Sequence, residues 1–389
     1  MKRIALIFNS DYQTWPLGGM ISYITQTVAM LSDTFEIDLW GCSVNGKAPE
    51  PVKINQVDYR ISVCANARTG KKLIPNVVRC FCGTMLNEGK FSPDRYDILY
   101  FHLSASALGW FCGKTLKNLL RGSRTSPLVI MHQHGMAYGN KIGNFLNYSA
   151  MNRADLVFFT TDRQSLETHR AHVKHPHVAW MPSMIDTDFF SPVSPEEKEK
   201  LRNTCRIPAD RKVFIYTGRI TAWKNPLLLL EAFEEFQRRN DHRGILIYVG
   251  DGEMLRELEQ AVQQKDLSDS VILTGRQPRT VLRDYLRLSD VFVLPSKGEG
   301  VSVSALEAMS TGLRVVGFQV EGMTGLVDPR SGILIKDQTA GCFADAMDSA
   351  IHGSFTPRTT AMEYSVENVK EMMIRQIQHA LQTKGNTLC

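Results

Sequence analysis

The stretch of residues 295–317, PSKGEGVSVSALEAMSTGLRVVG, constrains the fold more than any other part of the sequence. A short apolar run at residues 291–294 precedes it and is typical of a buried parallel strand. A loop of small residues and a predicted helix from about Ser304 to Ser310 follow. Gly312 then ends the helix before a second apolar strand at residues 314–317. A strand, a helix and a second strand in this order predict a parallel sheet covered by helices.

Two carboxylates and a helix start in this stretch suit a phosphorylated ligand that carries hydroxyl groups. Backbone N–H groups of Val301, Ser302 and Val303 precede the helix, where free amides attract phosphate oxygens. The Glu307 carboxylate can accept hydrogen bonds from a ribose, and Glu299 can reach the next sugar. The alternative is a surface turn whose glutamates are merely solvated.

The same stretch resembles the donor-binding signature of retaining glycosyltransferases of family 4, the glycosyltransferase group 1 with the GT-B fold. That pattern has a glutamate, seven residues, and a second glutamate followed by Ala-Met, which matches Glu299 and Glu307 here. Two departures are Ser302, where the family usually has glycine, and Ser304, where it often has proline. Serine keeps its backbone N–H, so phosphate binding is expected to survive.

The chain of 389 residues is too long for one ordinary core and predicts two domains. No run approaches eighteen apolar residues, so no transmembrane helix is expected. The apolar run at residues 4–8 is too short for a signal peptide and is expected to be a first core strand. We therefore expect a cytoplasmic protein with eight reduced cysteines, and the net charge of +5 does not call for nucleic acid as a partner.

Alternating strand and helix signals over the first half predict a doubly wound parallel sheet. Gly18 and Gly19 follow the first strand and precede a helix at residues 21–31. Such a pair lets the backbone approach a ligand, although tight turns use it constantly. The resemblance implies that this glycine loop borders the donor phosphates.

Residues 66–95 combine basic with apolar side chains, and the apolar ones include Leu73, Ile74 and Phe81. The basic residues are Arg68, Lys71, Lys72, Arg79 and Lys90, followed by Arg95 at the end of the segment. A basic amphipathic segment of this kind can lie on an anionic membrane. It can equally be a core helix with a solvated basic face. We expect peripheral association with the inner face of the cytoplasmic membrane only as an open alternative.

Three histidines stand at the ends of two predicted strands, where open α/β sheets place their ligands. His102 follows the strand at residues 97–101, and His132 and His134 follow the strand at residues 127–131. No carboxylate or cysteine stands close in sequence, so no metal site is expected. The resemblance implies that His134, which precedes a glycine, faces the transferred sugar.

The boundary between the domains is predicted near residue 190. Asp186 and Asp188 form an Asp-x-Asp pair, which we interpret as a turn at this boundary rather than a metal site. Residues 191–210 are rich in Pro, Glu and Lys and read as a linker. The predicted N-terminal domain, residues 1–190, binds the acceptor and is completed by a C-terminal helix over 366–389. The C-terminal domain, residues 191–365, binds the nucleotide sugar.

Arg219 and Lys224 follow the first strand of the second domain. A guanidinium fork and a point charge can together clamp a diphosphate, although two solvated loop cations would look the same. The loop resembles the Gly-Arg…Lys element with which family 4 neutralises the leaving nucleoside diphosphate. Arg276, just after a later strand, stands where relatives line the nucleotide base.

The resemblance implies an α/β protein of the GT-B fold, with two Rossmann-like doubly wound domains facing across a cleft and a C-terminal helix that crosses back to the first domain. It implies a retaining transfer of sugar from a nucleoside diphosphate sugar, with a UDP-sugar favoured over a GDP-sugar and no metal or other cofactor. His134, Glu299, Arg219 and Lys224 are the catalytic candidates. The acceptor is expected to be a lipid-linked sugar or an oligosaccharide in the assembly of bacterial surface polysaccharide or glycolipid. A nucleotide-sugar epimerase and a non-catalytic sugar-nucleotide binder remain as alternatives.

Overall fold

The computed structural model divides the chain into two compact units, residues 1–183 with 369–389, and residues 184–368. It describes residues 1–8, 19–43, 52–54, 57–59, 61–66, 95–103, 127–134, 144–145, 148–149, 151–161, 163–174 and 177–387.

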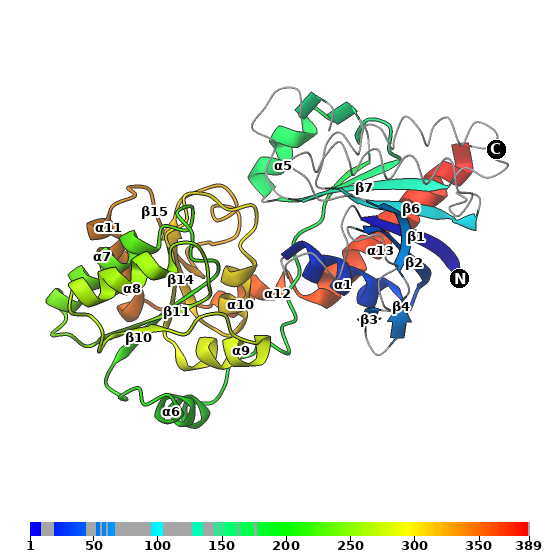
Figure 1. The fold of residues 1–389 in the computed structure, drawn as a ribbon. Coiled ribbons are helices and arrows are strands. Elements are labelled where there is room, and N and C mark those ends of the chain that lie inside the picture. The colour runs from blue at the N-terminus through cyan, green and yellow to red at the C-terminus, as the bar shows by residue number, and fades with distance from the viewer. Residues whose placement is uncertain are drawn as a thin grey trace. The chain divides into compact units, whose positions relative to one another are not determined.

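The first unit is built on a parallel sheet of seven strands in the order β5-β2-β1-β6-β7-β8-β9 (Figure 1). These strands are β1 (Lys2–Phe8), β2 (Phe35–Ser43), β5 (Ile61–Asn66), β6 (Ile98–Leu103), β7 (Leu128–His134), β8 (Leu156–Thr160) and β9 (Val178–Trp180). Its described helices include α1 (Gly19–Leu31) and α5 (Arg163–Arg170), and β3 (Val52–Ile54) pairs antiparallel with β4 (Val57–Tyr59).

The central strands of this sheet are nearly continuous apolar runs because helices cover a parallel sheet on its faces. One core cluster shows this composition: its buried members include Ile7, Leu99, Phe101, Val157 and Phe159. β6 and β7 continue past their predicted ends, so that His102 and His134 are the last or next-to-last residues of strands rather than loop residues.

The C-terminal helix α13 (Val366–Thr387) belongs to the first unit from residue 369 onwards. It buries one side chain per turn, namely Val369, Met373, Ile377 and Ala380. The prediction that this helix returns to the first domain is confirmed. Near the end of this helix, Lys384 Nζ donates to Pro127 O at 2.8 Å and to Asp155 Oδ2 at 2.6 Å.

The second unit has a parallel sheet of six strands in the order β12-β11-β10-β13-β14-β15. The strands are β10 (Lys212–Thr217), β11 (Gly244–Val249), β12 (Val271–Leu273), β13 (Val291–Leu294), β14 (Arg314–Phe318) and β15 (Gly332–Ile335). The helices are α6 (Pro195–Thr204), α7 (Pro226–Arg239), α8 (Leu255–Gln264), α9 (Arg279–Leu288), α10 (Val303–Ser310), α11 (Ala340–His352) and α12 (Pro357–Met362).

Helix α6 lies inside the stretch predicted to be a linker. Ser194 caps it by accepting a hydrogen bond from Glu197 N, and Pro195 occupies its first turn. The helix has no buried residue, because its attachment to the unit is polar. Helix α6 has no apolar stripe and therefore cannot be recognised from the periodicity of apolar residues in the sequence.

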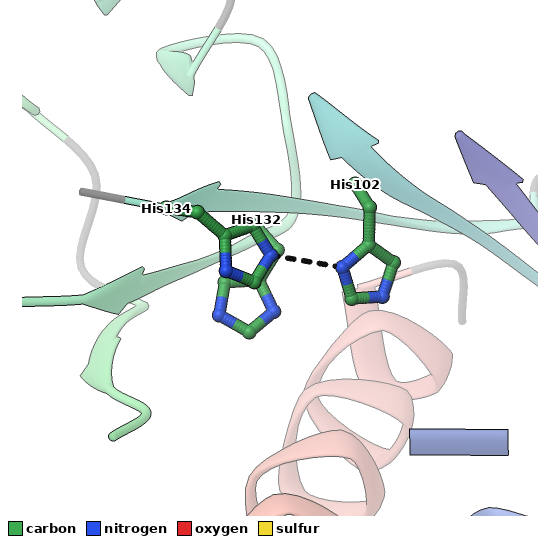
Figure 2. A group of neighbouring side chains, drawn as sticks. All are labelled: His102, His132 and His134. Atoms are coloured by element: carbon green, nitrogen blue, oxygen red, sulfur yellow. Dashed lines mark hydrogen bonds between the residues drawn. The ribbon is translucent and has the colours of Figure 1, made fainter. Parts of the chain in front are cut away.

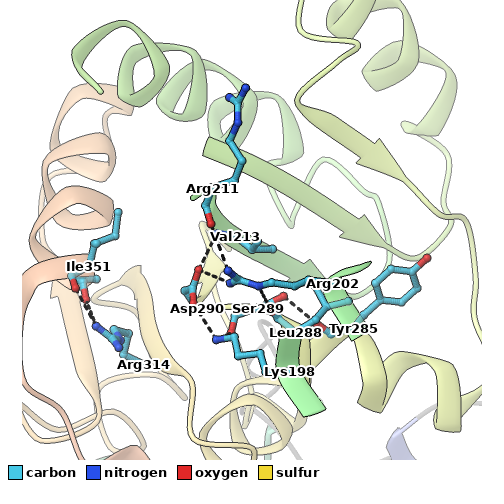
Figure 3. A network of polar contacts seen from close by, with 11 residues as sticks. Lys198, Arg202, Arg211, Val213, Tyr285, Leu288, Ser289, Asp290, Arg314 and Ile351 are labelled. Carbon is cyan, nitrogen blue, oxygen red and sulfur yellow. Dashed lines mark hydrogen bonds and ion pairs between the residues drawn. The ribbon is translucent and has the colours of Figure 1, made fainter. Parts of the chain in front are cut away.

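A single carboxylate, Asp290, ties α6 to the sheet (Figure 3). Its two oxygens accept from Lys198 Nζ at 2.8 Å and Arg202 Nη2 at 2.7 Å, and Oδ2 also accepts from Val213 N at 2.8 Å. Burial works against ionisation, but the two cations outweigh it and hold the pKa of Asp290 below its usual range. Asp290 thereby holds α6 and the start of β10 against the start of β13.

Each unit is a Rossmann-like, doubly wound α/β layer structure, which confirms the predicted fold class for the two units. In each sheet, strands that follow one another along the chain are added first on one side and then on the other. The change of side occurs between β1 and β6 in the first unit and between β10 and β13 in the second. Ligands of open α/β sheets bind outside the carboxyl ends of the strands at such a switch point. The candidate residues are therefore sought at these two strand pairs.

Candidate functional site

The switch point of the second unit brings together two of the predicted loops. Arg219 and Lys224 lie between β10 and α7, and residues 295–302 lie between β13 and α10. Lys224 Nζ forms an ion pair with Glu299 Oε1 at 2.5 Å, and the Glu299 residue is only 8% exposed. Two residues 75 positions apart in sequence are thus direct partners.

Two further hydrogen bonds join the same loops. Trp223 Nε1 donates to Gly298 O at 2.8 Å, and Lys297 N donates to Trp223 O at 3.0 Å. A side chain at position 298 would displace the Trp223 ring, because a Cβ there would lie 2.9 Å from it. The loops therefore hold the Lys224 ammonium in one place, as a charge clamp requires.

A turn after β14 supports the Glu299 loop from another direction. Glu299 N donates to Glu321 O at 3.2 Å. Gly322 has φ of 80°, and a Cβ on it would lie 2.3 Å from Glu299 O. Only glycine combines this backbone conformation with so close an approach.

Ser302 is the N-cap of α10. Its Oγ accepts from Ala305 N at 3.3 Å and lies 3.1 Å from Ser304 Oγ. Its φ of −78° is open to any residue, so serine replaces the family's glycine here without backbone strain. The first turn of α10, which begins at Val303, leaves N–H groups without an intrahelical acceptor. The structure thus shows the predicted helix start, and the binding of an anion there stays a prediction.

Glu307 lies inside α10, one to two turns beyond that helix start. Burial raises the pKa of its carboxyl to about 7, and the Arg279 guanidinium partly offsets that rise. Arg279 itself lies over the rings of Phe189 and Phe190, 5.2 and 5.1 Å from their centroids. Arg276, in the loop after β12, and Arg279 are both exposed. The cation that lowers the pKa of Glu307 is Arg279, which no sequence motif indicated.

Arg219 contributes its charge to the same switch point. Tyr216 Oη donates to Arg219 O at 2.7 Å. Burial raises the pKa of Tyr216; the nearby Glu299 carboxylate adds to the rise, and the Arg219 guanidinium opposes it. Tyr216 therefore lies within the fields of both candidate residues, a position that no motif indicated.

The first unit carries a separate cluster, in which three histidines share one face of the sheet (Figure 2). His102 pairs with His132 across β6 and β7, and His134 lies two residues further along β7. The ring centroids of His132 and His134 are 4.1 Å apart in a stacked arrangement. Tyr23 of α1 meets His134 edge-on at 4.8 Å. Burial lowers the pKa of all three histidines, to about 3 for His134, so the cluster is neutral.

One ring nitrogen from each of these histidines lies within 4.8 Å of those from the other two, near enough for the three to be considered as metal ligands. Three imidazoles are a sufficient ligand set, although no carboxylate or thiol accompanies them. His132, however, uses both nitrogens in hydrogen bonds: Nδ1 with Tyr100 Oη at 2.8 Å and Nε2 with Thr160 Oγ1 at 2.7 Å. In this arrangement His132 has no lone pair left for a metal.

Several predicted features lie outside the described residues. Gly18 is among them, as are Gly135 and nearly all of the basic segment 66–95, whereas Gly19 is described as the first residue of α1. The Asp-x-Asp pair is described and behaves as a turn, because Asp186 Oδ1 accepts from Phe189 N at 2.9 Å. Among the described helices, none is long and apolar enough to cross a membrane.

Comparison with known proteins gives one family match. The model of the glycosyl transferases group 1 matches residues 197–369, which nearly coincide with the second unit. Over 375 residues the chain is 26% identical to D-inositol 3-phosphate glycosyltransferase 2 of Catenulispora acidiphila, covering 89% of this chain and 86% of that protein.

Two solved structures extend the similarity to the whole chain. Sucrose-phosphate synthase from Thermosynechococcus elongatus superimposes with a TM-score of 0.76 at 20% identity, covering 98% of this chain and 100% of the other. HepE of Anabaena in complex with UDP and glucose superimposes with a TM-score of 0.73 at 15% identity, covering 97% and 100%. At these identities the structures establish the fold alone.

Proposed function

Because residues 197–369 match the model of the group 1 glycosyl transferases and the two units have the layer structure of the GT-B fold, we propose that this chain transfers a sugar from a nucleoside diphosphate sugar to an acceptor hydroxyl with retention of the anomeric configuration. The observation that carries the proposal is the Lys224–Glu299 pair at the switch point of the second unit, beside the start of α10. A fixed cation and free helix-start amides are what a departing diphosphate needs.

In the proposed reaction the bond between the anomeric carbon and the phosphate oxygen breaks, and negative charge grows on the diphosphate. Lys224, Arg219 and the amides of Val301, Ser302 and Val303 stabilise that charge. The acceptor oxygen then bonds to the anomeric carbon on the same face, and its proton passes to the leaving phosphate oxygen. Glu299 and His134 position the sugar, whose anomeric centre has oxocarbenium character.

The nucleoside part of the donor is assigned to Glu307, Arg276 and Arg279. A Glu307 carboxylate would accept hydrogen bonds from both ribose hydroxyls. We propose a uridine nucleotide rather than a guanosine nucleotide, which agrees with the UDP that HepE binds in its solved complex. Gly18 and Gly19 are proposed to border the diphosphate.

The predicted domain roles complete the proposal. Residues 191–365 would bind the nucleotide sugar, and residues 1–190 with the helix over 366–389 would bind the acceptor. We propose a lipid-linked sugar or an oligosaccharide as the acceptor, in the assembly of bacterial surface polysaccharide or glycolipid. The protein would then work in the cytoplasm, on the inner face of the cytoplasmic membrane.

A nucleotide-release assay tests this proposal. Purified protein is incubated with UDP-, GDP- and ADP-sugars, with and without a membrane lipid extract. Release of UDP that rises with the extract is the expected result. Epimerised donor without acceptor would instead indicate an epimerase, and binding without turnover a non-catalytic partner.

The same assay tests whether a divalent metal is needed. The two loop cations and the helix amides already provide positive charge at the leaving group, so we propose that the reaction needs no metal. Adding a chelator should leave the rate unchanged. Loss of activity that returns with added Mg²⁺ or Mn²⁺ would contradict this.

A further inference from the structure

His102 and His134 are direct partners in the first unit. His102 Nδ1 and His134 Nε2 lie 2.9 Å apart, the distance of a hydrogen bond between two imidazoles (Figure 2). His102 is 1% exposed, and its other nitrogen, Nε2, is fully buried and has no hydrogen-bond partner among the described residues. Because a buried unpaired polar atom costs free energy, this pair requires an explanation.

The neighbouring His132 shows how a structural histidine is satisfied. Thr160 Oγ1 donates its only proton to Met181 O at 2.8 Å, so it accepts from His132 Nε2–H. His132 Nδ1 must then accept from the Tyr100 hydroxyl. Its tautomer is therefore fixed entirely by its surroundings within the described part of the chain.

The His102–His134 pair is not fixed in this way. A neutral imidazole has one donor and one acceptor nitrogen. If His102 Nδ1 donates, His134 Nδ1 carries the remaining proton and His102 Nε2 is an acceptor. If His134 Nε2 donates instead, His102 Nε2 carries the remaining proton and His134 Nδ1 is an acceptor. The hydrogen-bonding state of His134 Nδ1 thus depends on His102.

The aromatic neighbours hold both rings in orientation while leaving the proton positions open. Tyr100 stacks on His102 with centroids 4.5 Å apart and an interplanar angle of 24°. Tyr23 packs edge-on against His134. Rotation of either ring would break these contacts, so the pair can respond to a ligand by shifting its shared proton without moving its rings.

We propose that His102 is a positioning residue for His134: through the Nδ1–Nε2 hydrogen bond it fixes the ring of His134 and sets whether His134 Nδ1 meets a sugar hydroxyl as donor or acceptor. This inference rests on the proposed function, in which His134 contacts the transferred sugar. It adds a residue from β6 that makes no contact with the substrate. A neutral pair suits a hydroxyl ligand, because a sugar hydroxyl can both donate and accept.

The experiment compares three variants at one position with a matched control. His102→Phe removes the hydrogen bond and keeps an aromatic ring, whereas His102→Asn places an amide where Nδ1 was and His102→Gln places it where Nε2 was. The control is His169→Phe, which alters another buried histidine of the same unit, one that bonds Tyr148 Oη at 2.9 Å and stacks on Phe159. All variants are first compared with the wild type by thermal unfolding.

Two measurements are made on each variant. Imidazole ¹⁵N NMR of the histidine-labelled protein reports the state of His134 without requiring activity. Donor turnover gives kcat and KM separately. We expect His102→Phe to shift the His134 nitrogen signals and to lower kcat by about 10- to 100-fold, with little change in KM for the donor. His102→Asn should restore most of kcat, whereas His102→Gln should be as impaired in kcat as His102→Phe. The control His169→Phe should keep the kcat of the wild type.

The two measurements separate the pairing from the function. Unchanged His134 signals in His102→Phe would overturn the coupling, whatever the activity. Shifted signals with wild-type kcat would overturn the positioning role. If the wild type transferred no sugar at all, the proposed function would fail and His102 would have no role in this reaction, while the signals would still report whether the pair exists. Signals that move on adding Zn²⁺ to the wild type would identify a metal site and overturn the proposal.

Discussion

Replacing Lys224 by alanine separates two consequences that the structure assigns to one ammonium group. It removes the cation proposed to stabilise the leaving diphosphate, and it leaves the Glu299 carboxylate without its partner at 2.5 Å. The first consequence is an effect on turnover and the second an effect on stability. Because both are measurable, the variant tests the proposed clamp directly.

The stability cost follows from the burial of the pair. The side chains are 22% exposed for Lys224 and 9% for Glu299. Exposed pairs contribute at most about 1 kcal/mol, and breaking a fully buried pair costs about 3–5 kcal/mol. A pair between these limits should cost about 2 kcal/mol, or a fall in Tm of about 4–8 °C for a unit of this size. Turnover should fall by about 10²- to 10³-fold, as for other lost contacts to a developing negative charge.

The control is Lys265→Ala in the same unit. Lys265 Nζ pairs with Glu234 Oε2 at the same distance of 2.5 Å, but the two side chains are 30% and 36% exposed. Its removal should cost less than about 1 kcal/mol and leave turnover unchanged. Glu299→Gln and the double variant Lys224→Ala with Glu299→Gln complete a cycle for the free energy of unfolding, in which a coupling of about 2 kcal/mol is expected.

The assays are nucleotide release at saturating donor and chemical unfolding at the same pH. Near wild-type turnover in Lys224→Ala would refute the clamp. A loss of turnover as large in Lys265→Ala would refute it as well, because it would show that activity follows general stability rather than the charge beside Glu299.

Two further predictions concern titratable groups of the second unit. The pKa of Glu307 is raised to about 7, so the contribution of its protonated form to stability is present below the ordinary pKa of a glutamate and is lost as pH rises through 7. Because ribose binding needs the ionised carboxylate, nucleoside affinity should rise about 10-fold from pH 6 to pH 8. Glu307→Gln should abolish that pH dependence in isothermal titration with uridine. A flat profile in the wild type would place the ribose elsewhere. Asp290→Asn should destabilise the protein by about 2–3 kcal/mol above pH 4, because it leaves Lys198 and Arg202 without the carboxylate that they share. The difference in stability from the wild type should vanish as pH falls through the lowered pKa of Asp290. Chemical unfolding at several pH values measures this, with the exposed Asp269→Asn as a control that should show no such loss.

Much of the second unit could be predicted from local patterns. The apolar run of β13, the small-residue loop and the helix over 303–310 are separated by few residues, and their chemistry is expressed in the sequence itself. Helix α6 could not be predicted, because charged side chains attach it and its partner Asp290 is more than 80 positions away. Arg279 was missed for a similar reason: its effect on Glu307 depends on how α9 and α10 lie in the folded unit, not on spacing.

What the sequence by itself determined is the set of loops and strand ends that carry the candidate residues, since the period of apolar residues fixes the strands, and glycine and polar clusters follow them. Which of those residues become partners was decided only by tertiary structure. The parallel strands β10 and β13 lie side by side, although 73 residues separate the end of β10 at Thr217 from the start of β13 at Val291. Because the strands are adjacent, Lys224 and Glu299 form an ion pair. The adjacency of β6 and β7 likewise makes a hydrogen-bonded pair of His102 and His134. Sheet order is set by long-range packing, and a hydrogen bond between two imidazoles needs a geometry that no spacing along the chain specifies.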